Sequence, residues 1–187
     1  MKGFNRFALV LLFTLLASCG FHLRGTVDLP PGIEPVYIGG PNPSAPLSIE
    51  LRNLLRNSGI ELADDAVSSR YQLIIGEQKS DRRTASLGEG ARAVEYQLIE
   101  TVSFELRNQE GKAVFGPNTL TERRVVTNDP NSVASSADTE NLQRREMQQN
   151  LAAKIARQLQ AFDYSAAQSN PTESAADTPT GSPATAQ

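Results

Sequence analysis

A long stretch of alternating apolar and polar residues, 93–107 (AVEYQLIETVSFELR), constrains this chain more than any other part of its sequence. The even positions carry the apolar side chains of Val94, Tyr96, Leu98, Val102, Phe104 and Leu106. The odd positions carry the polar side chains of Glu95, Gln97, Thr101, Ser103, Glu105 and Arg107. Because successive side chains of a strand point to opposite faces, this period predicts a β-strand with one buried face and one wet face. Ile99 and Glu100 interrupt the alternation, so we expect either a bulge there or a partner that covers the outer face.

Other parts of the chain predict the remaining elements of one sheet. Strands are expected over residues 33–38, 70–76 and 112–127, with the second extending as far as Lys79 and the last bent at 116–118. A hairpin turn at 108–111 joins the third and fourth strands, and residues 80–92 are expected to form a polar connector. A first helix is expected from Pro46 to a cap at Gly59. The element order predicts an α+β fold, a four-stranded mixed β-sheet with two α-helices packed on one face.

The second helix is expected from Asp138, its N-cap, to Phe162. Apolar residues recur along it at helical spacing, beginning with Leu142: Met147, Leu151, Ile155, Leu159 and Phe162. This stripe is predicted to contact the protein core rather than lipid.

The N-terminus has the layout of an export signal. Residues 1–6 carry Lys2 and Arg6, and residues 7–17 are uncharged and apolar, too few for a membrane span. Residues 16–19 (LASC) resemble the bacterial lipobox, with cleavage between Ser18 and Cys19. Cys19 would then carry an N-acyl and an S-diacylglycerol lipid, enough chains for lasting anchorage. An ordinary secretory signal with a chance cysteine is the alternative.

Cysteine count, charge and composition limit the disulfides, the partners and the extent of the folded domain. Cys19 is the only cysteine, so no internal disulfide stabilises the fold. Removing residues 1–18, which carry Lys2 and Arg6, changes the formal net charge from −3 to −5, and this argues against a general nucleic-acid binder. Gly20 rather than Asp follows Cys19, which favours export to the outer membrane. We therefore expect a cleaved signal peptide (1–18), one α+β domain (19–162) and a disordered C-terminal tail (163–187), which lacks Val, Ile, Leu, Lys and Arg.

Several short motifs together resemble the LPS-assembly lipoprotein family of Gram-negative bacteria, LptE (also RlpB). They are residues 19–25 (CGFHLRG), 46–48 (PLS), 52–53 (RN) and 93–98 (AVEYQL). The resemblance implies a non-enzymatic outer-membrane lipoprotein, anchored by lipid in the inner leaflet on the periplasmic side. It also implies that the protein plugs and helps to assemble an LptD-type β-barrel, binds lipopolysaccharide and takes part in its transport and insertion into the outer leaflet.

Arginines are the candidates for contact with lipopolysaccharide phosphates, because their planar forks bind phosphate in a bidentate way. The candidates are Arg82, Arg83 and Arg92 on the connector, expected to lie together at one end of the sheet, and Arg123 and Arg124 on the fourth strand. The alternative is that all five are solvated surface charges. Arg144 and Arg145 are adjacent on the second helix and are expected to be surface residues.

Two other function classes compete with this one. The chain has no phosphate-binding glycine loop and no Cys/His metal-ligand spacing, so an enzyme or a metal site is not predicted. The sequence does not exclude hydrolysis by a pair of carboxylates, because Asp and Glu are plentiful. The second class is a generic outer-membrane lipoprotein that acts as a cell-wall-binding module or structural anchor. No cofactor is expected other than the lipid on Cys19, and His22 and Arg24 have no physical role beyond placing the acylated terminus.

Overall fold

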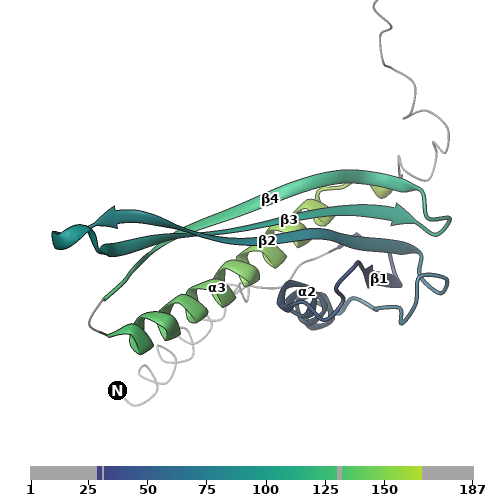
Figure 1. The fold of residues 1–187 in the computed structure, drawn as a ribbon. Coiled ribbons are helices and arrows are strands. Elements are labelled where there is room, and N and C mark those ends of the chain that lie inside the picture. The colour runs from purple at the N-terminus through teal and green to yellow at the C-terminus, as the bar shows by residue number, and fades with distance from the viewer. Residues whose placement is uncertain (1–28, 31, 130–131, 166–187) are drawn as a thin grey trace, which may run out of the picture.

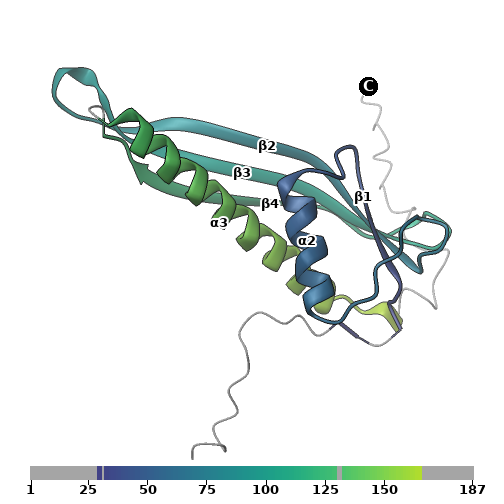
Figure 2. The same ribbon diagram turned by 90° about the horizontal axis from the view of Figure 1, so that it is seen from below.

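A computed structural model describes residues 29–30, 32–129 and 132–165. The elements in chain order are β1 (Val36–Gly39), α2 (Pro46–Asn57), β2 (Tyr71–Leu87), a 3-10 turn (Glu89–Ala91), β3 (Ala93–Asn108), β4 (Ala113–Thr127) and α3 (Val133–Gln160). The sheet order is β1-β2-β3-β4, with β1 parallel to β2 and the other neighbours antiparallel. Both helices lie against the same face of the sheet (Figures 1 and 2). The predicted α+β fold is confirmed.

The strand β2 is much longer than the sequence pattern suggested. It runs on to Leu87, so most of the stretch 80–92, expected to be a connector, pairs with β3 as far as the tip. That prediction was wrong because both faces of this part of β2 are polar or charged, and period-two alternation in hydrophobicity is therefore missing. In contrast, β1 is shorter than the expected strand 33–38.

No bulge lies in β3 at Ile99 and Glu100, because the register with both neighbouring strands runs straight through them. The shift lies in β2 instead, between Ile75 and Gln78. Glu100 keeps its place on the helix-covered face, where Arg144 pairs with it. At the other end, the register of β4 shifts around Gly116, as the predicted bend requires.

The helix α3 begins at Val133, before the expected N-cap Asp138, and ends at Gln160. Nothing between Ser132 and Asp138 stops a helix, and Asp138 is an exposed residue inside it. Leu142 was expected to begin the apolar face, but it is 48% exposed. The buried face begins at Met147 and continues through Leu151, Ala152, Ile155, Ala156 and Leu159. Among the described residues no helix has the length and apolarity needed to cross a membrane.

The buried residues form two clusters of unequal size. The large one lies where α2 and the last turns of α3 cover the sheet at its β1 end, and it includes Leu51, Leu73 and Phe104. It extends to Tyr164, in the stretch expected to be tail, whose ring packs edge-on against Tyr71. The small cluster, Leu98, Val126 and Met147, lies further along the sheet. Residues 1–28 and 166–187, which contain the predicted signal, Cys19 and most of the tail, lie outside the described residues.

Candidate functional site

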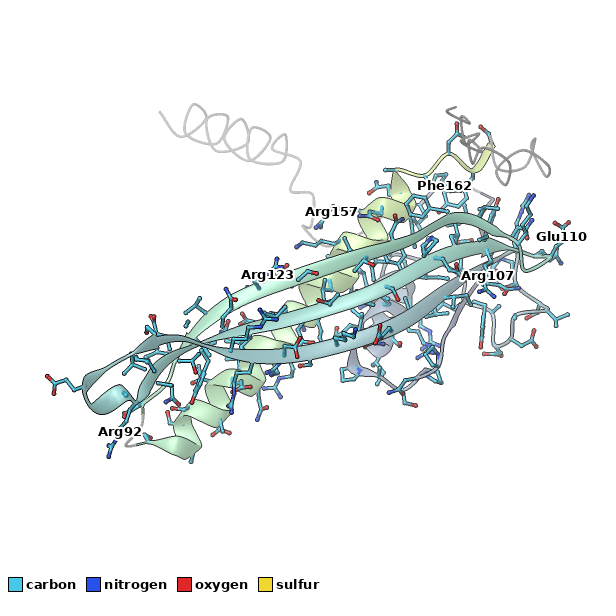
Figure 3. All side chains as sticks on the ribbon, turned by 45° about the horizontal axis from the view of Figure 1, so that its top comes forward. Arg92, Arg107, Glu110, Arg123, Arg157 and Phe162 are labelled. Carbon is cyan, nitrogen blue, oxygen red and sulfur yellow. The ribbon has the colours of Figure 1, made fainter. Side chains whose placement is uncertain are left out.

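The end of the sheet at the β2–β3 connection, here called the distal end, holds an open pocket of about 450 Å³. Figure 3 shows Arg92 at this end, far from Arg107 and Glu110 at the opposite end. Arg82 and Arg92 line the pocket, together with Tyr96, Asn128 and Glu140. Residues from three strands and the first turns of α3 therefore meet around two guanidinium groups.

Arg82 is held at the edge of this pocket by two contacts. Its Nη1 donates to Glu140 Oε2 at 3.0 Å, and its guanidinium lies 4.5 Å from the centre of the Tyr96 ring. Its side chain is still 51% exposed. An anion could therefore reach Arg82, but it would compete there with a carboxylate.

The structure does not bring the five candidate arginines into one cluster. Arg82 and Arg92 share the pocket, whereas Arg124 lies beneath the sheet and donates to Gln143 at 2.7 Å and to Glu146 at 2.5 Å. Arg83 and Arg123 pair in register with Gln97 and Ile99 of β3, on the face that the helices leave open. In Figure 3, Arg123 points outward from β4.

A chain of polar contacts beneath the sheet links the pocket to the middle of the molecule. Arg144 Nη1 lies 2.5 Å from Glu100 Oε1, and its Nη2 lies 2.8 Å from Glu140 Oε1. Ser80 donates to Glu100 at 2.6 Å. Arg144 is thus not the free surface residue expected from the sequence. The signal that could have revealed it is Glu100 itself, a charge at a core position of the alternation.

The charged groups in this chain of contacts shift one another's pKa values. Burial raises the pKa of Glu140, but hydrogen bonds from Arg144 and Arg82 outweigh it and hold the pKa below its ordinary value. Burial lowers the pKa of Arg144, yet its hydrogen bonds to Glu140 and Glu100 leave the pKa raised. Both groups therefore stay charged at neutral pH, which preserves the contacts across the sheet.

The face of the sheet opposite the helices is rich in hydrogen-bonding groups. The hydroxyls of Thr101 and Thr121 lie 3.2 Å apart across two strands, and Ser103 accepts a hydrogen bond from the backbone of Glu77 at 2.9 Å. No helix or strand of the described chain covers this face (Figures 1 and 3). It forms a long surface suited to polar contacts. Within the described ranges, no group of three or more His, Cys, Asp and Glu side chains could hold a metal ion.

Comparison with known proteins places this fold in a family. The sequence model described as "LptE: Lipopolysaccharide-assembly" matches residues 33–159, from before β1 nearly to the end of α3. The chain belongs to the LptE family. A role in lipopolysaccharide assembly follows from this membership, and the matched range includes every element that forms the distal pocket.

Relatives named "LPS-assembly lipoprotein LptE" cover most of the chain. The protein of Pectobacterium atrosepticum is 28% identical over 177 residues, which are 93% of this chain and 95% of its own. The LptE of Yersinia pestis (strain Pestoides F) is 30% identical over 145 residues, 76% of this chain and 69% of its own. The sequence-based recognition of the family is confirmed.

Solved structures agree on the fold. The solution structure of lipoprotein B from Nitrosomonas europaea matches with a TM-score of 0.61 and 28% identity over 76% of this chain and 92% of its own. The crystal structure of rare lipoprotein B from Shewanella oneidensis gives a TM-score of 0.60 at 22% identity over 67% of this chain and 93% of its own, which supports the fold alone.

Proposed function

We propose that this chain is an outer-membrane lipoprotein that plugs an LptD-type β-barrel, helps it to assemble and takes part in moving lipopolysaccharide to the outer leaflet. The observation that carries this proposal is the LptE family match over residues 33–159. The motif CGFHLRG at residues 19–25 resembles the same family and supports the same role.

The uncovered sheet face is compatible with a place inside a barrel. The lumen of a wide outer-membrane barrel is polar, so a plug needs hydrogen-bonding groups rather than an apolar patch. The hydroxyls of Thr101, Ser103 and Thr121 supply such groups along this face. In the proposal, this face contacts the barrel wall.

The arginines at and near the distal end are the proposed contacts for lipopolysaccharide phosphates. Arg82 and Arg92 share a pocket, and Arg83 is exposed on the other face of the same end. Arg123 and Arg124 belong to β4, and Arg124 would first have to leave Glu146. Guanidinium groups bind phosphate through paired, charge-assisted hydrogen bonds.

Lipid on Cys19 is the proposed anchor. After cleavage behind Ser18, an N-acyl and an S-diacylglycerol group would hold the N-terminus in the inner leaflet of the outer membrane, on the periplasmic side. Two or more acyl chains give lasting attachment because each buried methylene adds about 0.8 kcal/mol. The role proposed for the domain is binding and positioning, without a catalytic step.

A pull-down of the tagged, full-length protein from detergent-solubilised outer membranes, followed by mass spectrometry, tests the proposal. We expect a large β-barrel in stoichiometric amount, absent from the same experiment with a tagged lipoprotein of another family. Recovery of the protein alone, or with cell-wall fragments only, would overturn the plug and favour the anchor role. Crosslinking from a photoreactive residue incorporated in place of Thr121 then tests whether the uncovered sheet face contacts the barrel.

A further inference from the structure

The two halves of α3 differ sharply in how they are attached to the sheet. None of the residues from Ala134 to Glu146 is buried, whereas Met147 is fully buried. From Met147 onward the helix buries a side chain on every turn: Leu151, Ala152, Ile155, Ala156 and Leu159. Figure 2 shows the first half lying under the distal end of the sheet, beyond the end of α2.

Ion pairs connect the first half of α3 to all three long strands. Glu140 pairs with Arg82 of β2 at 3.0 Å, and Arg144 pairs with Glu100 of β3 at 2.5 Å. Glu146 pairs with Arg124 of β4 at 2.5 Å. Among the described residues, the buried apolar cluster near them is the small one of Leu98, Val126 and Met147, with Tyr96 packed against it.

Such contacts give little net stability. Ion pairs near the surface contribute little and weaken with salt, and the arginines here are between 21% and 51% exposed. Burial of the Glu100–Arg144 pair carries a desolvation cost. That cost is removed when the helix opens and water reaches both charges. The second half is different, because its side chains belong to the large apolar cluster. Segments with few buried apolar contacts open locally at low free-energy cost.

We propose that residues 133–146 of α3 form a lid that opens from the sheet while residues 147–160 stay packed, and that anions open it by competing with Glu140 and Glu146 for Arg82 and Arg124. Opening frees both guanidinium groups on the underside of the sheet, with Tyr96 on β3, the strand between them, and Val126 on β4 beside Arg124. The exposed surface then suits an anionic group with an apolar neighbour. The opening of this lid does not require the proposed barrel partner.

Hydrogen-exchange mass spectrometry on the full-length protein tests the lid. We expect amides of 133–146 to exchange faster than those of 147–160 at low salt. Raising NaCl from about 0.01 M to about 1 M shortens the Debye length from roughly 30 Å to roughly 3 Å. Exchange of 133–146 should then rise roughly fivefold, with little change in 147–160. Equal rates and equal salt responses in the two halves would overturn the lid, because the helix would then open as one unit.

Two single variants separate the ion pairs of the lid from those of the packed half. Arg124→Gln removes the pair with Glu146, and we expect faster exchange of 133–146 by a fewfold. Lys154→Gln removes the pair between Lys154 and Glu122, at the packed half of the helix, and should leave 133–146 unchanged. Acceleration of 133–146 by Lys154→Gln to the same degree would contradict the proposal.

Sodium pyrophosphate tests the anion competition. At an ionic strength matched with NaCl, pyrophosphate should accelerate exchange of 133–146 more than NaCl does, because its clustered oxygens can replace a carboxylate on an arginine. The excess should shrink in Arg124→Gln. If the two salts accelerate exchange of 133–146 equally in the unmodified protein, the anions only screen charge. The proposal that anions compete with the carboxylates is then wrong.

Discussion

Glu100 of β3 and Arg144 of α3 form a 2.5 Å ion pair on the helix-covered face of the sheet. Glu100 stands between Leu98 and Val102 in the alternation, and both of these neighbours are buried in apolar clusters. The Glu100 side chain is only 8% exposed. A carboxylate with so little water around it depends on its protein partners for its charge to be tolerated.

Replacing Arg144 with Met should leave Glu100 buried without its counter-charge. We expect a loss of roughly 1–2 kcal/mol in the free energy of unfolding, measured by urea denaturation followed by circular dichroism, because opening of residues 133–146 lets water reach Glu100 and limits the cost. Arg145→Met, an exposed neighbour, is the matched control and should cost well under about 1 kcal/mol. The double variant Glu100→Leu with Arg144→Met should recover most of the loss, because no uncompensated charge remains. Equal costs for the two single variants would mean that the ion pair contributes nothing.

Glu140 should make stability fall in acid. Its pKa lies below the ordinary value of about 4.3, so the folded state favours the charged form. Its contribution is therefore present above about pH 4.3 and is lost as the pH falls through the lower folded value. Glu140→Gln should cost about 1 kcal/mol at neutral pH and make the acid dependence shallower. Urea midpoints across this range test it, with Asp138→Asn, an exposed carboxyl on the same helix, as control. An identical acid dependence in Glu140→Gln would contradict the prediction.

Gly40 should tolerate no side chain. Its φ is +147°, and a Cβ there would lie 2.1 Å from the carbonyl oxygen of Ile75. We expect Gly40→Ala to cost at least about 2 kcal/mol, measured by thermal unfolding. Gly59 also has a positive φ, +83°, but nothing lies within 4 Å of its Cβ position. Gly59→Ala should therefore cost only about 1 kcal/mol, and a cost equal to that of Gly40→Ala would exclude the clash as the cause.

Removing Arg83 and Arg92 together should weaken lipopolysaccharide binding. Both side chains are exposed, so the double alanine variant should keep its circular dichroism spectrum and unfolding midpoint. We expect binding of fluorescent lipopolysaccharide to weaken at least about tenfold, because charge-assisted hydrogen bonds are lost. Arg157→Ala, an exposed arginine on the last turn of α3, is the control. Unchanged affinity in the double variant would end the phosphate proposal.

Cys19→Ala should abolish lipid attachment. Labelling of cells with radioactive palmitate, followed by capture of the tagged protein, should give a band for the unmodified chain and none for the variant. The expected physical consequence is release from the membrane, since no acyl chain would remain to hold the N-terminus. Persistent labelling of the variant would refute the lipobox interpretation.

The sequence predicts best those elements of this fold that have one apolar face. The alternation of β3 and the leucine spacing of α2 correspond to elements that cover the large cluster, so both were predicted with nearly the right bounds. The outer part of β2 has no apolar face, since Arg82 points to Glu140 while Arg83 lies on the wet face. Hydrophobic periodicity cannot report a strand whose covered face is ionic.

The sequence names candidate arginines, but it does not predict how they are arranged. Five arginines are candidates for contact with phosphate, and of these five Arg82 and Arg92 line the distal pocket. Successive side chains of a β-strand point to opposite faces of the sheet. Arg82 and Arg83 are successive residues of β2, so they lie on opposite faces. The prediction of a connector over 80–92 did not include this separation. The roles of Arg144 and Glu140 depend on contacts between elements far apart in sequence, which no local pattern encodes.

The parallel place of β1 sets the order in which the chain gains structure. β2, β3 and β4 follow one another through short turns, whereas β1 reaches β2 only after α2 and the loop behind it. Local pairings form sooner than distant ones because less chain entropy is lost on closing the shorter loop. We therefore expect the three long strands to pair before α2 docks. Until it docks, Leu73 lacks its helix cover, so this end of the sheet is where aggregation of incompletely folded chains should begin.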